Sequence, residues 1–65
     1  MIFHIMINEL GTTHMEQVLA ESAQVAVQTA LEFGETVGAV YPSAGGSFYV
    51  TSALRQMLVI PDDCL

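Results

Sequence analysis

Residues 13–34, with the sequence THMEQVLAESAQVAVQTALEFG, decide the fold that this chain is expected to adopt. After Thr13 the stretch contains no glycine or proline until Gly34, so nothing in it interrupts a helix. Thr13 followed by Glu16 fits a capping box, and Gly34 stands where a left-handed residue ends a helix. We therefore predict one helix of about 20 residues, roughly 30 Å long at a rise of about 1.5 Å per residue.

The predicted helix has one narrow polar stripe and a broad apolar arc when its residues are placed at about 100° per residue. The polar stripe consists of Gln17, Glu21, Gln24, Gln28 and Glu32. The apolar arc consists of Met15, Val18, Leu19, Ala23, Ala26, Val27, Ala30 and Phe33. A helix that packs on one face of a sheet needs a narrower arc, so part of this surface is expected to form an interface.

Strand-like runs flank the helix on both sides. Ile2–Asn8 (IFHIMIN) is short and rich in β-branched and aromatic residues, and both of its faces are apolar. Thr36–Tyr41 (TVGAVY) and Ser47–Thr51 (SFYVT) predict a hairpin around the turn residues 42–46. Met57–Ile60 (MLVI) predicts a short last strand that ends at a proline, and the tail after it is expected to be loose.

These elements predict a single α+β domain over residues 1–65. One long helix is expected to pack on a small, mostly antiparallel sheet, in the order β-α-β-β with a possible short last strand. One helix covers only one face of such a sheet. The other face, which carries some of Ile2, Met6, Val40 and Tyr49, is then exposed in a monomer, and we expect a C2 homodimer.

The charge balance restricts the function. The chain has no lysine, and its only strong base is Arg55, so the net charge is -6 on 65 residues. Such a surface cannot neutralise phosphates, which argues against direct binding to nucleic acid or to an anionic membrane. Charged residues are only 12% of the chain and apolar residues 52%, a balance that also argues against disorder and against a dense DNA mimic. The expected partner is a protein with a basic surface.

No set of residues predicts catalysis, a metal site or a cofactor site. His4 and His14 are two possible ligands without a third, and we expect His4 to have a backbone or solvent partner and His14 to be solvated. Cys64 follows two aspartates, which raise the pKa of a thiol and make it a poor nucleophile. Ser43 and Ser47 flank a glycine-rich turn without the following helix that a phosphate loop or a nucleophile elbow requires. The chain is therefore predicted to be non-enzymatic.

Some residues are candidates for contact with a partner. Arg55 is expected to pair with a carboxylate of the same chain or to make one specific contact. Phe48 and Tyr49 point to opposite faces of a strand, so one should fill the core and the other reach outward. The predicted partner-binding residues are Glu21, Glu32, Glu35, Tyr49, Asp62 and Asp63.

The layout from Ala20 to Met57 resembles that of small inhibitors of mobile elements, of which the anti-CRISPR proteins of phages are the best-known group. A long helix that ends in the sequence Ala30-Leu31-Glu32-Phe33-Gly34 and is followed by a hairpin carries this resemblance. Because these inhibitors share no motif, no binding residue is transferred from them. The resemblance implies stoichiometric inhibition, in which an acidic face docks on the basic nucleic-acid groove of an effector, such as a CRISPR effector complex.

Three functions are therefore open. The first is an acidic binding protein that inhibits a nucleic-acid-handling effector. The second is a small homo-oligomeric ligand-binding or metabolic accessory domain, with an apolar pocket between subunits, and the third is a subunit of a larger complex. The run from Met1 to Ile7 lacks a basic region and is too short to span a bilayer, so we expect a cytoplasmic protein, in the host cytoplasm if a phage encodes it.

Overall fold

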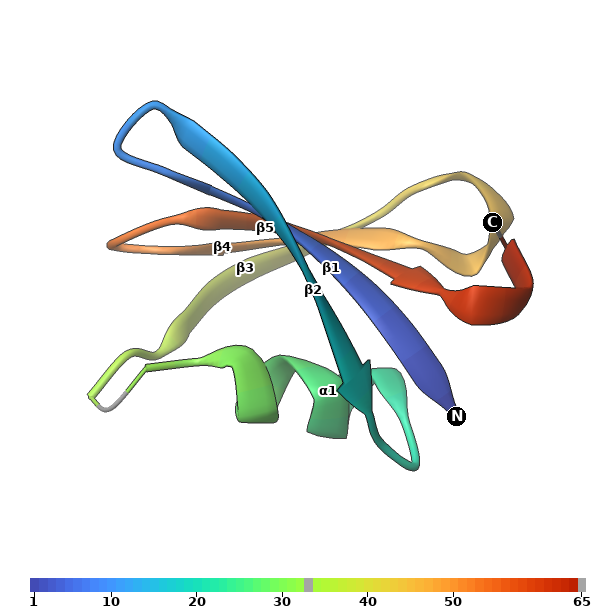
Figure 1. Cartoon of the computed structure of the whole chain (residues 1–65). Coiled ribbons are helices and arrows are strands. Elements are labelled where there is room, and N and C mark those ends of the chain that lie inside the picture. The colour runs from blue at the N-terminus through green and yellow to red at the C-terminus, as the bar shows by residue number, and fades with distance from the viewer. Residues whose placement is uncertain (33, 65) are drawn as a thin grey trace.

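The computed structural model describes residues 1–32 and 34–64, which form a twisted sheet with one helix against one of its faces (Figure 1). The strands and the helix are β1 (Ile2–Glu9), β2 (Thr12–Leu19), α1 (Ala23–Ala30), β3 (Val37–Pro42), β4 (Phe48–Ser52) and β5 (Gln56–Pro61). Two short 3-10 helices, η1 (Ala44–Gly46) and η2 (Asp62–Cys64), follow β3 and β5. No helix within the described residues is long and apolar enough to cross a membrane.

The sheet has five strands in the order β2-β1-β5-β4-β3, and each neighbouring pair is antiparallel. The first strand therefore lies inside the sheet, between the second and the last. Its central place pairs both edges of β1 with neighbouring strands. Only the face with Phe3, Ile5 and Ile7 is buried under α1, while Ile2 and Met6 on the other face are exposed. The predicted run Ile2–Asn8 is confirmed as β1, and the two strands of the predicted hairpin and the short last strand are confirmed as β3, β4 and β5.

The prediction of one long helix is wrong. Residues 12–19 form β2, which pairs along its whole length with β1, and the helix covers only Ala23–Ala30. Leu10 and Gly11 form the two-residue turn between these strands, and both have a positive φ, 51° and 77°. Pairing with β1 provides backbone hydrogen bonds and cross-strand contacts that outweigh the weak helical preference of residues 13–19.

The predicted capping box is wrong for the same reason, because Thr13 and Glu16 lie in β2. The helix begins later, where the Ser22 hydroxyl accepts a hydrogen bond of 3.3 Å from the backbone N–H of Val25. It ends at Ala30 rather than at Gly34, although Gly34 does have a left-handed φ of 83° in the turn that follows. The predicted helical residue Phe33 lies outside the described residues.

The core lies between the sheet and α1. Phe3, Ile5 and Ile7 of β1 are buried there together with residues of the neighbouring strands, Val18, Val50, Met57 and Val59. From α1, Ala26 and Val27 face this layer and are buried, and the small side chain of Ala26 allows the helix to approach the strands closely. The architecture is therefore mostly an antiparallel sheet with one short helix against one of its faces, and the other face is not covered by α1. The order β-β-α-β-β-β replaces the predicted α+β order β-α-β-β, because residues 12–19 add a strand before the helix.

The turn between β3 and β4 and the tail after β5 were also predicted from the sequence. The turn predicted at residues 42–46 begins one residue later, because Pro42 ends β3, and the backbone N–H of Ser43 donates a hydrogen bond of 2.9 Å to the Ser47 carbonyl across it. The tail is more ordered than expected, because Asp62–Cys64 form η2, which contacts β1. Leu65 and the side chain of Cys64 lie outside what the structure describes.

Candidate functional site: the uncovered face of the sheet

The strands separate two sets of side chains by simple alternation. Every second residue of β1, from Phe3 to Ile7, points toward α1, and the residues between them point away from it. The side that points away from α1 is called the open face here. Phe48 packs against the core while Tyr49 is 47% exposed on the open face, which confirms the prediction that these neighbours point in opposite directions.

An apolar row crosses the open face from edge to edge. The strand registers place its members directly opposite one another, because Met6 pairs with both Met15 and Leu58, and Tyr49 pairs with both Leu58 and Tyr41. The apolar row is therefore Met15, Met6, Leu58, Tyr49 and Tyr41, taken from β2 through β3. Leu58 is half-buried and the other four are exposed, so the row forms a continuous apolar strip on the surface.

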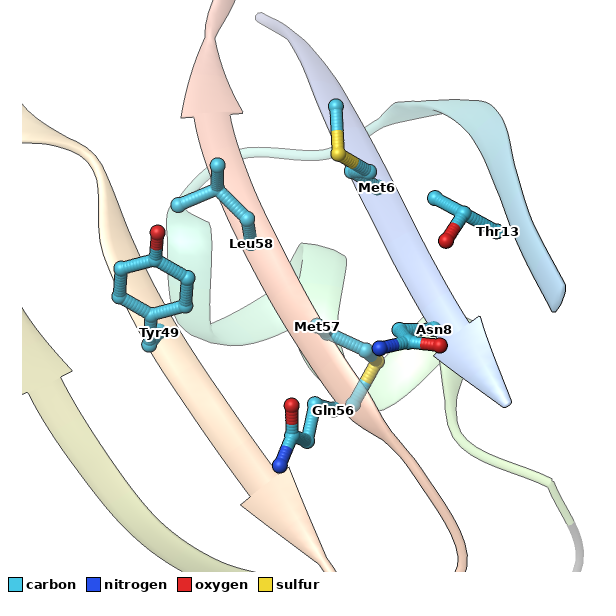
Figure 2. A pocket seen from close by; sticks show the side chains of 7 residues that line it. All are labelled: Met6, Asn8, Thr13, Tyr49, Gln56, Met57 and Leu58. Atoms are coloured by element: carbon cyan, nitrogen blue, oxygen red, sulfur yellow. The ribbon is translucent and has the colours of Figure 1, made fainter. Parts of the chain in front are cut away.

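A polar row lies beside the apolar row. Asn8 pairs with Thr13 and with Gln56, and Gln56 pairs with Thr51, so amides and hydroxyls stand in line across four strands. A shallow hollow of about 180 Å³ opens between the two rows. It is lined by Met6, Asn8, Thr13, Tyr49, Gln56, Met57 and Leu58, whose side chains Figure 2 shows around it. The hollow can receive a small apolar group and offer it hydrogen bonds at one end.

The open face has no formally charged side chain at its strand positions within the described residues. The carboxylates of the two N-terminal strands, Glu9 and Glu16, alternate onto the side of α1. Glu21 and Glu32 flank α1 and are exposed. The carboxylates therefore lie beside the strand residues of the open face, on the side of α1 and at η2, rather than among them.

Arg55 is buried and bound internally, which confirms the prediction of an intramolecular ion pair. Its Nη2 and Nε atoms donate hydrogen bonds of 2.7 to 3.1 Å to the Glu35 carboxylate, and Nη2 also reaches the Ala30 carbonyl at 2.6 Å. The side chains of Arg55 and Glu35 are only 4% and 1% exposed. Hydrogen bonds from Arg55 lower the pKa of Glu35 from 4.5 to about 2, against the opposing effect of burial, with help from the Ser52 hydroxyl.

This ion pair determines which charged side chains remain on the surface of the molecule. Because Arg55 is the only lysine or arginine of the chain, no such side chain is exposed. Of the seven carboxylate side chains, only that of Glu35 is neutralised by Arg55. The six others are Glu9, Glu16, Glu21, Glu32, Asp62 and Asp63.

His4 lies on the open face but is buried, because η2 covers it. Its Nε2 atom lies 2.7 Å from Oδ1 of Asp62. The expectation of a backbone or solvent partner for His4 is therefore replaced by a side-chain partner far away in the sequence. His14 is exposed on β2, with its Nε2 atom 3.5 Å from Oε1 of Glu16. Among the described residues, no three histidine, cysteine or acidic side chains come together as a metal site.

The predicted partner-binding residues do not form one cluster. Glu21 and Glu32 are exposed beside α1, Tyr49 is on the open face, and Asp62 and Asp63 are at η2. Glu35 is enclosed by its ion pair, which removes its carboxylate from the exposed surface. Sequence reasoning missed Met15 and Leu58 as members of the apolar row. Val40, which was among the residues expected on this face, lies on the side of α1, opposite the buried Val50. Residues 13–19 do not alternate strictly between polar and apolar residues, so local periodicity gave no signal for Met15.

Comparison of the chain with protein families, with curated proteins and with solved structures returns no match.

Proposed function

We propose that this protein is a non-enzymatic acidic binding protein that docks on a basic, nucleic-acid-binding surface of an effector protein in the cytoplasm and inhibits it stoichiometrically. The burial of Arg55 against Glu35 is the observation that carries this proposal. It leaves an exterior whose charged side chains, apart from the histidines, are carboxylates. Such a surface attracts basic surfaces and repels nucleic acid.

The open face supplies the second part of the proposal. Protein interfaces combine an apolar centre with a polar rim, and the contribution of the apolar centre is largest where water is excluded. The apolar row provides such a centre, and the carboxylates around it provide long-range attraction. In this proposal the carboxylates raise the association rate, and Tyr49 and the neighbouring apolar side chains slow dissociation.

The proposal rests on charge and exposure rather than on the resemblance to anti-CRISPR proteins. That resemblance depends on a long helix followed by a hairpin, and the first part of that helix is β2. A CRISPR effector complex is therefore one candidate among several proteins with basic nucleic-acid grooves.

A displacement assay tests the proposal. Fluorescently labelled RNA or DNA is bound to each member of a panel of purified proteins with basic grooves, including CRISPR effector complexes, and the acidic protein is titrated in. We expect displacement of the nucleic acid from at least one member at a one-to-one ratio, with an affinity that falls as salt rises from about 50 to 300 mM. The proposal would be contradicted if no member of the panel lost its nucleic acid, or if the affinity did not change with salt concentration.

A charge series provides the matched control. The variant Glu21→Gln with Glu32→Gln removes two exposed charges beside α1, and the variant Gln24→Glu with Gln28→Glu adds two exposed charges on α1 itself. The first should slow association with the responding effector about threefold or more, and the second should speed it. If both variants associate at the same rate as the unmodified protein, electrostatic attraction is not the basis of binding.

A further inference from the structure

The two edges of the sheet differ in how they are protected against pairing with another strand. The edge strand β3 has an irregular register between Val37 and Ala39, and it ends in Pro42. Bulges and prolines are common devices that prevent edge-to-edge pairing. β2 has neither, because it pairs regularly with β1 over all eight residues and contains no proline, glycine or lysine. Residues 12–17 of β2 are exposed.

The turn before β2 determines which of its backbone groups are free to pair. In a two-residue hairpin the residues that flank the turn, here Glu9 and Thr12, exchange both backbone hydrogen bonds. Alternation along the strand then directs the backbone N–H and C=O groups of Thr13, Met15 and Gln17 away from β1. An antiparallel strand added at this edge would bond to these three residues.

We propose that β2 pairs in antiparallel fashion with β2 of a second copy of this chain, about a two-fold axis that passes beside Met15. Such an axis is perpendicular to the sheet. It places the residue that follows Met15 by any number of positions opposite the partner's residue that precedes Met15 by the same number. His14 then stands opposite Glu16 of the partner subunit, and Glu16 stands opposite the partner's His14. The ionisable side chains of β2 thus become two complementary cross-strand pairs.

Other positions of the axis are less favourable. An axis at Glu16 would place the two Glu16 carboxylates opposite each other, which is destabilising in an already acidic molecule. An axis at His14 would place the two imidazoles opposite each other and would shorten the paired segment. With the axis at Met15, the whole of residues 12–18 is paired, and Thr13 stands opposite Gln17 of the partner subunit.

The pairing has a consequence for the open face. Two five-stranded sheets joined at β2 become one continuous sheet, and the apolar rows of both copies meet at Met15. The dimer therefore presents one apolar strip that crosses the strands of both subunits. The dimer expected from the sequence was different, because it buried the open face, and the two arrangements are distinguished by substitution.

The first measurement is the molar mass of the unmodified protein by sedimentation equilibrium at micromolar concentration. We expect twice the 7.0 kDa mass of one chain, and a mass of 7.0 kDa would overturn the proposal. The second measurement uses Met15→Pro, which removes an outward N–H without removing a bond to β1. This variant should be monomeric where the unmodified protein is dimeric, with an unchanged far-ultraviolet circular dichroism spectrum.

A charge-exchange cycle tests the register. His14→Glu places carboxylates opposite the partner's Glu16 at two places and should weaken dimerisation about tenfold. The double variant His14→Glu with Glu16→His again places a histidine opposite each glutamate across the axis and should recover most of the loss. Gln28→Glu changes the net charge by the same amount at an exposed helix position, so it is the matched control and should have little effect.

Variants of the open face separate the two arrangements. Tyr49→Ser leaves the β2 edge intact and should not change the dimer mass. A dimer that Tyr49→Ser dissociates, while Met15→Pro and His14→Glu do not, would assign the interface to the open face and overturn the pairing of β2. Failure of the double variant to recover dimerisation would also contradict the proposed axis.

Discussion

Arg55 holds Glu35 at both carboxylate oxygens, with hydrogen bonds of 2.7 to 3.1 Å. This pair joins the segment after α1 to the turn between β4 and β5. Nη2 of Arg55 also binds the carbonyl of Ala30, the last residue of α1. One side chain therefore ties the end of the helix, the following loop and a hairpin together.

Removal of Arg55 should strongly destabilise the fold. Arg55→Met leaves the Glu35 carboxylate buried without its cation, which costs on the order of 3–5 kcal/mol of unfolding free energy. Urea denaturation followed by circular dichroism measures the loss. In the double variant with Glu35→Gln the loss should be clearly smaller than in Arg55→Met alone, because no buried charge is left unpaired. Equal losses in the two variants would show that the ion pair itself contributes little.

The same pair predicts a dependence of stability on pH. The pKa of Glu35 is about 2 in the folded protein against 4.5 for the free side chain, so its contribution is fully present above about pH 4.5. It is lost as the pH falls toward 2, and the loss amounts to about 3 kcal/mol. Urea denaturation at pH 6 and at several lower pH values should show this decline. Glu35→Gln should have a flatter profile over this range, and identical slopes would contradict the assignment.

The contact between His4 and Asp62 should hold η2 against the open face. Asp62→Ala removes the partner of a buried imidazole and should cost about 1 kcal/mol of unfolding free energy. Backbone amides of η2 should then exchange with deuterium faster, while those of β1 stay protected. Glu21→Ala, which removes an exposed carboxylate beside α1, is the comparison variant and should have a smaller effect on the exchange of η2 and on stability.

The turn between β1 and β2 offers a stabilising substitution. Leu10 has a φ of 51° and is 96% exposed, so a large apolar residue occupies a left-handed position without burying its side chain. Asparagine adopts this conformation more readily, and Asn-Gly is the preferred sequence of such turns. Leu10→Asn should therefore raise the unfolding free energy by about 0.5–1 kcal/mol, measured by urea denaturation. Gly11→Ala should have the opposite sign, because alanine is strained at a φ of 77°.

The acidic character of the molecule around the candidate surface was predictable from the sequence, whereas the location of that surface was not. The absence of lysine follows from composition alone. Apart from histidines, the charged side chains of any surface can therefore only be carboxylates and one arginine. The sequence could also predict that Arg55 pairs internally, since a single base among many acids finds a partner easily. It could not identify Glu35, because the two residues approach only when the loop after α1 folds against the β4–β5 turn.

The apolar row depends on pairing between segments that are distant in the sequence. Met6 and Leu58 meet because β1 and β5 are neighbours in the sheet, and Leu58 meets Tyr49 because β4 follows on the other side. Alternation predicts which residues of one strand share a face, but it does not predict which strands are adjacent.

By itself, the sequence determined the acidic character, the strand between Ile2 and Asn8, the hairpin around residues 42–46 and the opposite directions of Phe48 and Tyr49, because each follows from composition or from local periodicity. Only the tertiary structure decided the state of residues 12–19. Met15, Val18 and Leu19 have the i, i+3, i+4 spacing of a helix. The strand forms because β1 has an open edge whose backbone groups must find a partner. Local propensity is worth tenths of a kcal/mol per residue, so pairing along a whole strand outweighs it.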